Sequence, residues 1–283
     1  MNARYFMPEI GRFVSPDTIV PDPSNPQSYN RYSYGFNNPV KYVDPSGHCG
    51  AEAAASGDDS YYVGYSEYST CVGLRSELEG LLGHTISGIW YLWQMQAMHE
   101  GGISLAAQGI PLGPSLTSSE HRAALLALTQ YWAQTDVPSL EISGRVVEFG
   151  FVLGSTIEDL IAVLSGHEGT GLVGHEPSRA GEYSSGKALA NRESGFNDFY
   201  GDPDPTNNQV HHTWYWIQMG YYHDYFTAMA GNIWHEIDPR AEQGRSWSDF
   251  RAGVWGIAVG SQLQNGQPDL FDLAQDLRIF LGK

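Results

Sequence analysis

The chain has little of several features that define common protein classes. Its 283 residues include two cysteines, Cys49 and Cys71, which are too few for a framework of several disulfides and lack a zinc-type spacing. Two free thiols are expected, and a single bridge between them is the alternative. No apolar run reaches the roughly 18 residues of a transmembrane helix. The N-terminal sequence MNARYFMPEIGRF lacks a basic segment followed by an apolar run, so we expect no signal peptide. Secretion or display at the cell surface would therefore need a carrier system.

Basic residues are also scarce. Lysine and arginine number 15 against 32 acidic residues, which gives a formal net charge of -17. Residues 1–48 hold four of each sign, so the whole deficit lies in 49–283. An acidic body repels phosphate backbones, so nucleic acid is disfavoured as a partner. The same charge suits docking to a basic protein.

What the chain does have is apolar and aromatic material for a core. Hydrophobic residues make up 41% of the sequence, with 8 Trp, 17 Tyr and 11 Phe, so composition does not indicate disorder. Alternating apolar residues and turn formers fill 1–48, whereas capped helical patterns begin at about residue 76. The predicted fold class is α+β, mainly α, with a short N-terminal β-hairpin-like appendage before a helical body.

The first 48 residues contain a series of specific words in a fixed order. ARYFMPEIGRFVSPD is followed by NRYSYGFNNPVKYVDPSGH, and this series resembles the C-terminal end of an Rhs/YD-repeat-associated core of polymorphic toxins. In that family a β-shell of YD repeats encloses a variable C-terminal toxin, and the junction follows a DPxG word. The resemblance implies a secreted effector in interbacterial competition. It also implies a cognate immunity protein and an Rhs shell or secretion apparatus as partners.

The same resemblance implies aspartyl autoproteolysis near the DPxG word, here 44–47, with Asp17 and Asp44 as the remnant pair. This chain departs from the family, because Met7 precedes Pro8 and residues 17–20 replace an earlier DPxG word. The alternative interpretation makes both aspartates turn caps. We therefore expect no self-cleavage after Gly47.

Composition shifts divide the remaining chain into three parts. Residues 49–84 form a small, polar linker that turns into a short helix. Residues 85–186 form a helical region that resembles pretoxin segments and ends in a Gly-rich break over 166–186. Residues 187–283 form the helical domain expected to be the effector, in which the aromatic run at 209–237 is one long helix or two. Small residues at 252–260 favour close helix approach.

Three residues of the last part are candidates for chemistry: Glu193, His211 and His212. RESGF resembles the ESGF word of lysozyme-like transglycosylases, whose glutamate is a general acid held in apolar surroundings. The two histidines are able to transfer protons near neutral pH. These residues suggest a hydrolase-type toxin with a Glu/His acid–base pair.

Each candidate also has a structural interpretation. Glu193 could be a solvated charge at the end of a helix, and His212 a core histidine bonded to a carbonyl or to Asn208. His212 and His223 lie about 16 Å apart along a helix, and His235-Glu236 lacks the second histidine of HExxH, so no metal or cofactor is indicated. The alternative function is a non-catalytic helical domain, or a degenerate orphan Rhs C-terminus without toxicity.

Overall fold

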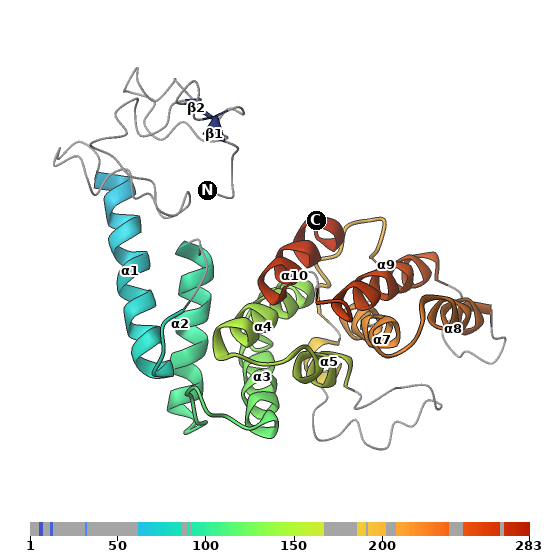
Figure 1. Ribbon diagram of the computed structural model, residues 1–283, viewed down its shortest axis with the longest axis horizontal. Coiled ribbons are helices and arrows are strands. Elements are labelled where there is room, and N and C mark those ends of the chain that lie inside the picture. Colours follow the sequence, from blue (N-terminus) through green and yellow to red (C-terminus); the bar gives the residue numbers. More distant parts are fainter. Residues whose placement is uncertain are drawn as a thin grey trace. The chain divides into compact units, whose positions relative to one another are not determined.

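Figure 1 shows the computed structural model of the chain, whose described part is mainly helical, as predicted. The structure describes residues 6–7, 12–13, 32, 62–86, 90, 92–166, 186–190, 192–201, 208–237, 246–266 and 269–283. Its elements are β1 (Phe6–Met7), β2 (Arg12–Phe13), α1 (Tyr62–Leu82), α2 (Leu92–Ala107), α3 (Ser118–Trp132), α4 (Ser139–Leu153), α5 (Ile157–Ser165), α6 (Gly186–Leu189), α7 (Gln209–Tyr222), α8 (Tyr225–Ile237), α9 (Trp247–Leu263), α10 (Leu270–Asp276) and the π-helical turn η4 (Leu277–Leu281). None of the helices in these ranges is long and apolar enough to cross a membrane.

The two short strands form an antiparallel pair. Phe6 lies opposite Phe13, and Met7 lies opposite Arg12. The rest of 1–48 lies outside the described residues, apart from Tyr32, so the β-hairpin-like appendage stays a prediction.

The chain divides into two compact units, and the first comprises residues 1–80 and 85–99. Helix α1 spans 21 residues, so the helix in the segment expected to be a linker is longer than predicted. Its C-terminal end is tied to the next loop by Glu79, whose Oε1 accepts hydrogen bonds from Arg75 Nε at 3.0 Å and from the Ile86 amide at 2.8 Å. Cys71 is a buried thiol that donates to the Trp90 carbonyl at 3.7 Å.

The second unit comprises residues 81–84 and 100–283, and therefore spans both sides of the Gly-rich segment at 166–186. Helix α5 packs on α7, and α10 packs on α4, so helices from both sides of that segment share one core. The segment 146–153, whose pattern fits either a strand or a helix, is part of helix α4. The buried Ser143 of this helix accepts a hydrogen bond from the indole of Trp214 on α7 at 2.8 Å.

The sequence STIE at 155–158 is typical of a capping box that begins at Ser155, but helix α5 begins one residue later. Thr156 is the N-cap, and its side chain and that of Asp159 cap each other's backbone amides. The helix ends at Gly166, which has a φ of 68°, as the sequence predicts. Asp159 also receives hydrogen bonds from Ser118 and from Arg122, the latter at 2.9 Å. This buried carboxylate therefore ties α5 to α3.

The aromatic run at 209–237 forms two helices. Asp224 lies at the break and caps α8, because its Oδ1 accepts the Thr227 amide at 3.1 Å. Helix α7 then packs on α9 more closely than ordinary side chains allow. A Cβ added at Gly256 would lie 2.8 Å from the Thr213 carbonyl oxygen, and one at Gly260 would overlap the carbonyl of Ile217. The small residues of α9 thus bring the two backbones into contact, as predicted.

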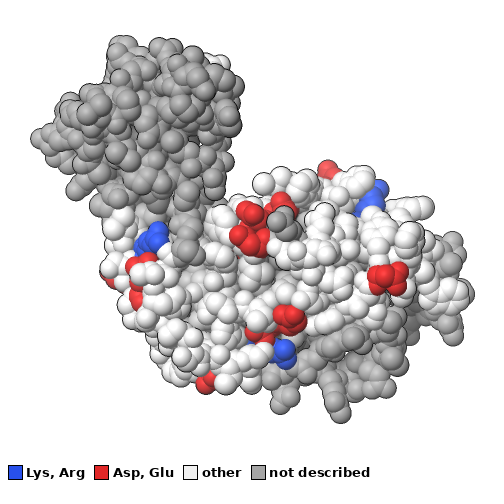
Figure 2. Space-filling model, in the orientation of Figure 1, with Lys and Arg blue, Asp and Glu red and all other residues white. Residues whose placement is uncertain are grey.

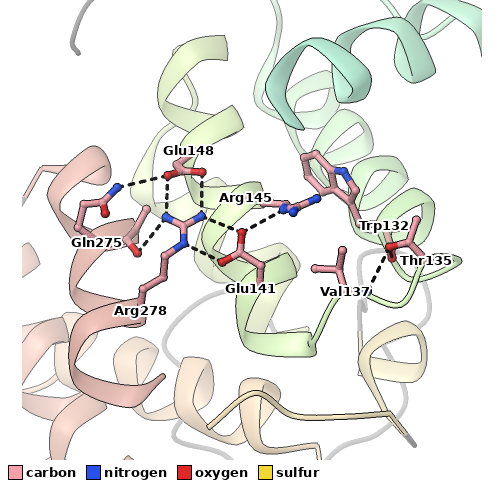
Figure 3. A network of polar contacts seen from close by, with 9 residues as sticks. Trp132, Thr135, Val137, Glu141, Arg145, Glu148, Gln275 and Arg278 are labelled. Atoms are coloured by element: carbon pink, nitrogen blue, oxygen red, sulfur yellow. Dashed lines mark hydrogen bonds and ion pairs between the residues drawn. The ribbon is translucent and has the colours of Figure 1, made fainter. Parts of the chain in front are cut away.

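A buried ion-pair network, which we call the Arg278 hub, joins the C-terminal elements to α4 (Figure 3). Arg278 bonds Glu141 through Nε at 2.7 Å, and Glu148 through Nη1 at 2.6 Å and Nη2 at 2.9 Å. The pKa of Arg278 is raised, because these two carboxylates outweigh the burial that lowers it. Gly144 makes room for the guanidinium, since its Cβ would lie 3.0 Å from Arg278 Cζ. Arg145 completes the hub by pairing with Glu141 at 3.0 Å.

Candidate functional site

The segment that holds Glu193 is a coil, although the sequence predicts helix up to Gly195. Helix α6 ends at Leu189, and the contacts of Arg192 explain why the helix does not continue. The Arg192 guanidinium donates to three carbonyls just after α3, those of Ala133, Thr135 and Val137, at 2.6–2.7 Å. These bonds hold the segment away from a helical path, and no local pattern in the sequence predicts them.

Backbone contacts fix the ESGF word between α4 and the end of the chain. The amides of Ser139 and Leu140 donate to the carbonyls of residues 193 and 194, both at 2.9 Å, and the Lys283 amide donates to Gly195 O at 3.1 Å. Gly195 has a φ of 77°, and a Cβ there would lie 2.8 Å from Pro138 Cβ. The ESGF residues therefore contribute backbone hydrogen bonds here. Position 195 requires glycine because its φ is positive and a Cβ would clash with Pro138.

The side chain of Glu193 points into solvent. It is 64% exposed and pairs with Lys283 Nζ at 3.2 Å, which is 59% exposed. An exposed pair of this kind contributes little to stability. Apolar surroundings are what keep a carboxyl protonated as a general acid, and the position of Glu193 does not supply them.

His212 lies on α7, with its side chain directed at α9. Its Nε2 is 3.0 Å from the carbonyl of Asp249 and 3.1 Å from the indole nitrogen of Trp216. The indole only donates and the carbonyl only accepts, so Nε2 serves one of them at a time. With a proton it donates to the carbonyl, and without one it accepts from the indole. The tautomer of this imidazole therefore decides which of the two partners is satisfied.

A second imidazole lies beside it. The ring of His235, on α8, has its centroid 5.6 Å from that of His212 and 6.1 Å from that of Trp216. Both histidines are partly buried, whereas Trp216 is 2% exposed. The histidine pair, His212 and His235, thus rests on a buried indole at the junction of α7, α8 and α9.

His211 faces a different side of α7, because adjacent helical residues diverge by about 100°. Its amide donates to the side chain of the N-cap Asn208 at 3.2 Å. Asn208 therefore caps the helix that carries His212 and does not contact that ring through this bond. Of the three predicted residues, His212 is the one that the described contacts place beside a second imidazole.

The sequence does not indicate His235 as a partner of His212, because the one motif that includes His235 is an incomplete HExxH. The pairing depends on the turn at Asp224, which folds α8 back so that residues 23 apart in sequence meet. In the described ranges no three His, Cys, Asp or Glu side chains are placed to hold a metal ion. Asp17 and Asp44 lie outside the described residues.

Figure 2 shows separate acidic groups and a few separate basic groups on the described part of one face, with no continuous basic area there.

Comparison with known proteins assigns the chain to no family. No protein-family model matches it, and neither a curated protein nor a solved structure does.

Proposed function

We propose that this chain is the C-terminal cassette of an Rhs-type polymorphic toxin protein. Residues 1–48 would be a β-hairpin-like remnant of the core, and the helical body would be the effector that a carrier secretes. The words of the first 48 residues support this origin. The acidic body supports a proteinaceous, basic partner, as a cognate immunity protein would be, over nucleic acid.

The activity we propose is acid–base hydrolysis at the histidine pair. The observation that carries it is the 5.6 Å separation of two partly buried imidazoles above Trp216. Histidine is the side chain whose charge changes most readily near neutral pH. The site lies within 187–283, the part expected to be the effector domain. His235 takes the place that the sequence suggests for Glu193.

The chemistry of this pair balances without a cofactor. One neutral imidazole accepts a proton from water as the oxygen attacks an electrophilic carbon of the substrate. The other imidazole, in its protonated form, donates a proton to the leaving group. The first ring then passes the proton it took from water to the second ring, which restores the starting protonation state of both imidazoles.

A specific contact favours the second candidate, a non-catalytic helical domain. The bond between His212 Nε2 and the Asp249 carbonyl also suits a histidine that only joins α7 to α9. On that account the ring of His212 only supplies a hydrogen-bond partner to the Trp216 indole or the Asp249 carbonyl, and no proton transfer takes place.

The two accounts predict different variants. Expression of the chain in a bacterium, with and without an attached export signal, measures toxicity as loss of growth. If the pair is catalytic, His212→Ala and His235→Ala each abolish toxicity, even at temperatures where the variant remains folded by circular dichroism. The matched control is His99→Ala on α2, a histidine paired with exposed Glu77, which should leave toxicity intact.

If the pair is structural, His212→Ala lowers stability by about 1–3 kcal/mol, and toxicity falls only as far as folding does. A well-folded His212→Ala/His235→Ala double variant with full toxicity would exclude the histidine pair as the active site. Absence of toxicity from the unmodified chain in both compartments would exclude the effector proposal itself.

A further inference from the structure

Helix α8 places its small and polar residues inward. Ala228 and Asn232 are both fully buried, and Asn232 Nδ2 donates to the Phe250 carbonyl of α9 at 3.1 Å. Gly253 of α9 makes this approach possible, because a Cβ there would lie 2.5 Å from Asn232 Oδ1. The contact of α8 with α9 therefore uses one narrow side of the helix.

The largest apolar side chains of α8 point the other way. Phe226 is 83% exposed, Trp234 is 60% exposed and Ile233 is 46% exposed, and Ala230 between them is exposed as well. Positions 226, 230, 233 and 234 share one face of a helix. Scattered apolar residues on a surface are ordinary, but a continuous stripe on one helix marks an interaction surface. We call these four residues the α8 stripe.

The spacing of the α8 stripe fits one kind of occupant. Anchors at i, i+4, i+7 and i+8 are those that a helix uses when it packs against apolar residues of another chain. Aromatic residues are also those that carry most binding energy at protein interfaces. The partner must therefore present an apolar helical face or groove.

Charge decides between a second copy and a different protein. The chain has a net charge of -17, and Asp224, exposed at the start of α8, is the described acidic group beside the α8 stripe. Two copies of so acidic a chain repel each other at close range, which disfavours self-association. A partner whose apolar face is flanked by lysine or arginine gains from the same charges.

We propose that the α8 stripe docks an amphipathic helix of a partner protein, with basic residues flanking its apolar face. Trp234 and Phe226 are its anchors, and Asp224, exposed at the start of α8, is the described acidic group at its rim. This inference rests on the faces of α8 and not on the proposed enzymatic activity, so it survives if the histidine pair proves inert.

The test uses the full chain and defined probes. A labelled leucine–lysine peptide of about 18 residues forms an amphipathic helix on contact, and its fluorescence anisotropy reports binding. The comparison probes are a leucine–glutamate peptide of equal length and vesicles of neutral phosphatidylcholine. The variant is Phe226→Ser/Ile233→Ser/Trp234→Ser, which leaves the charge unchanged. The control variant is Ile279→Ser/Phe280→Ser, two side chains of η4 that are 70% and 53% exposed.

The proposal expects the leucine–lysine peptide to bind the unmodified chain and the control variant equally. The α8 variant should bind at least about tenfold more weakly, because aromatic anchors dominate such contacts. Binding should also weaken as salt rises. Circular dichroism and the melting temperature of the α8 variant verify folding, and Phe226→Ser alone serves if the triple variant does not fold.

Four outcomes would overturn the proposal. Equal peptide binding by the α8 and control variants would assign the effect to overall charge. Equal binding of the leucine–glutamate peptide would remove the basic component. Vesicle binding that depends on the stripe, without peptide binding, would identify a lipid surface. A dimer in light scattering that becomes a monomer in the α8 variant would make the occupant a second copy.

Discussion

Replacing Arg278 by methionine removes the centre of the Arg278 hub while keeping much of its volume. Two carboxylates then lose their partner. The side chain of Glu148 is fully buried, and that of Glu141 is 25% exposed and keeps its 3.0 Å pair with Arg145. Glu148 keeps its contact with the side-chain amide of Gln275, 3.4 Å away. The change therefore removes the Arg278 cation from one buried carboxylate and weakens the pairing of a second.

The expected loss follows from this geometry. Removing one partner of a buried ion pair costs about 3–5 kcal/mol, because the remaining charge stays desolvated. For a unit of this size, each kcal/mol lowers the melting temperature by about 2–4 °C, so we expect a fall of about 6–20 °C. Such a loss is a large share of the roughly 5–15 kcal/mol that stabilises a typical domain.

Urea unfolding followed by tryptophan fluorescence measures the loss, and thermal unfolding by circular dichroism checks it. The matched control is Arg278→Met with Glu141→Gln and Glu148→Gln, which removes the buried charges together and should recover most of the stability. A loss below about 1 kcal/mol for Arg278→Met alone would refute the argument that the buried charge of Glu148 depends on the Arg278 guanidinium. It would mean that water or a rearranged side chain replaces the guanidinium.

The remaining predictions concern packing, pH and the Glu193 segment. Gly260→Ala should lower the free energy of unfolding in urea by about 2–3 kcal/mol, because its Cβ overlaps α7. Gly80→Ala, in open space on α1, should be neutral or stabilising by up to about 1 kcal/mol, and equal effects of the two changes would contradict the backbone contact. Burial raises the pKa of Asp159, but hydrogen bonds from three side chains outweigh it, so the pKa falls below its usual 3.8. Its contribution is therefore present above about pH 4 and lost as the pH falls below that value, and Asp159→Asn should flatten this part of a stability–pH curve. Arg192→Met should lower stability by about 1–3 kcal/mol, since it removes the donors of three carbonyls, and an unchanged melting temperature would show that water replaces them.

Local patterns in the sequence predict much of the helical body. Gly166, the first residue of the predicted Gly-rich break, is the C-cap of α5. The sequence SWSD at 246–249 is typical of a capping box, and Ser246 is the N-cap of α9, where its side chain accepts the Asp249 amide. Both depend on contacts within four residues, which a sequence displays directly. The small residues of α9 likewise predict close helix approach, because few other features explain so many glycines in one helix.

The features that local patterns did not predict depend on residues far apart in sequence. The helix expected around Glu193 is absent because Arg192 binds carbonyls more than fifty residues earlier. The histidine pair requires α7, α8 and α9 to assemble first. Neither contact has a counterpart in the spacing of nearby residues, so the candidate site could be predicted only as far as His212.

The backbone contact between α7 and α9 also restricts how this region can move. With no side chain between them at Gly256 and Gly260, sliding or rotation of one helix past the other would disturb close backbone packing, so we expect the two helices to move together. Helix α8 carries His235 and meets these helices through a narrow side around Asn232. A motion that opens or closes the histidine pair must therefore be a displacement of α8, and quenching of Trp216 fluorescence by His235 would report it.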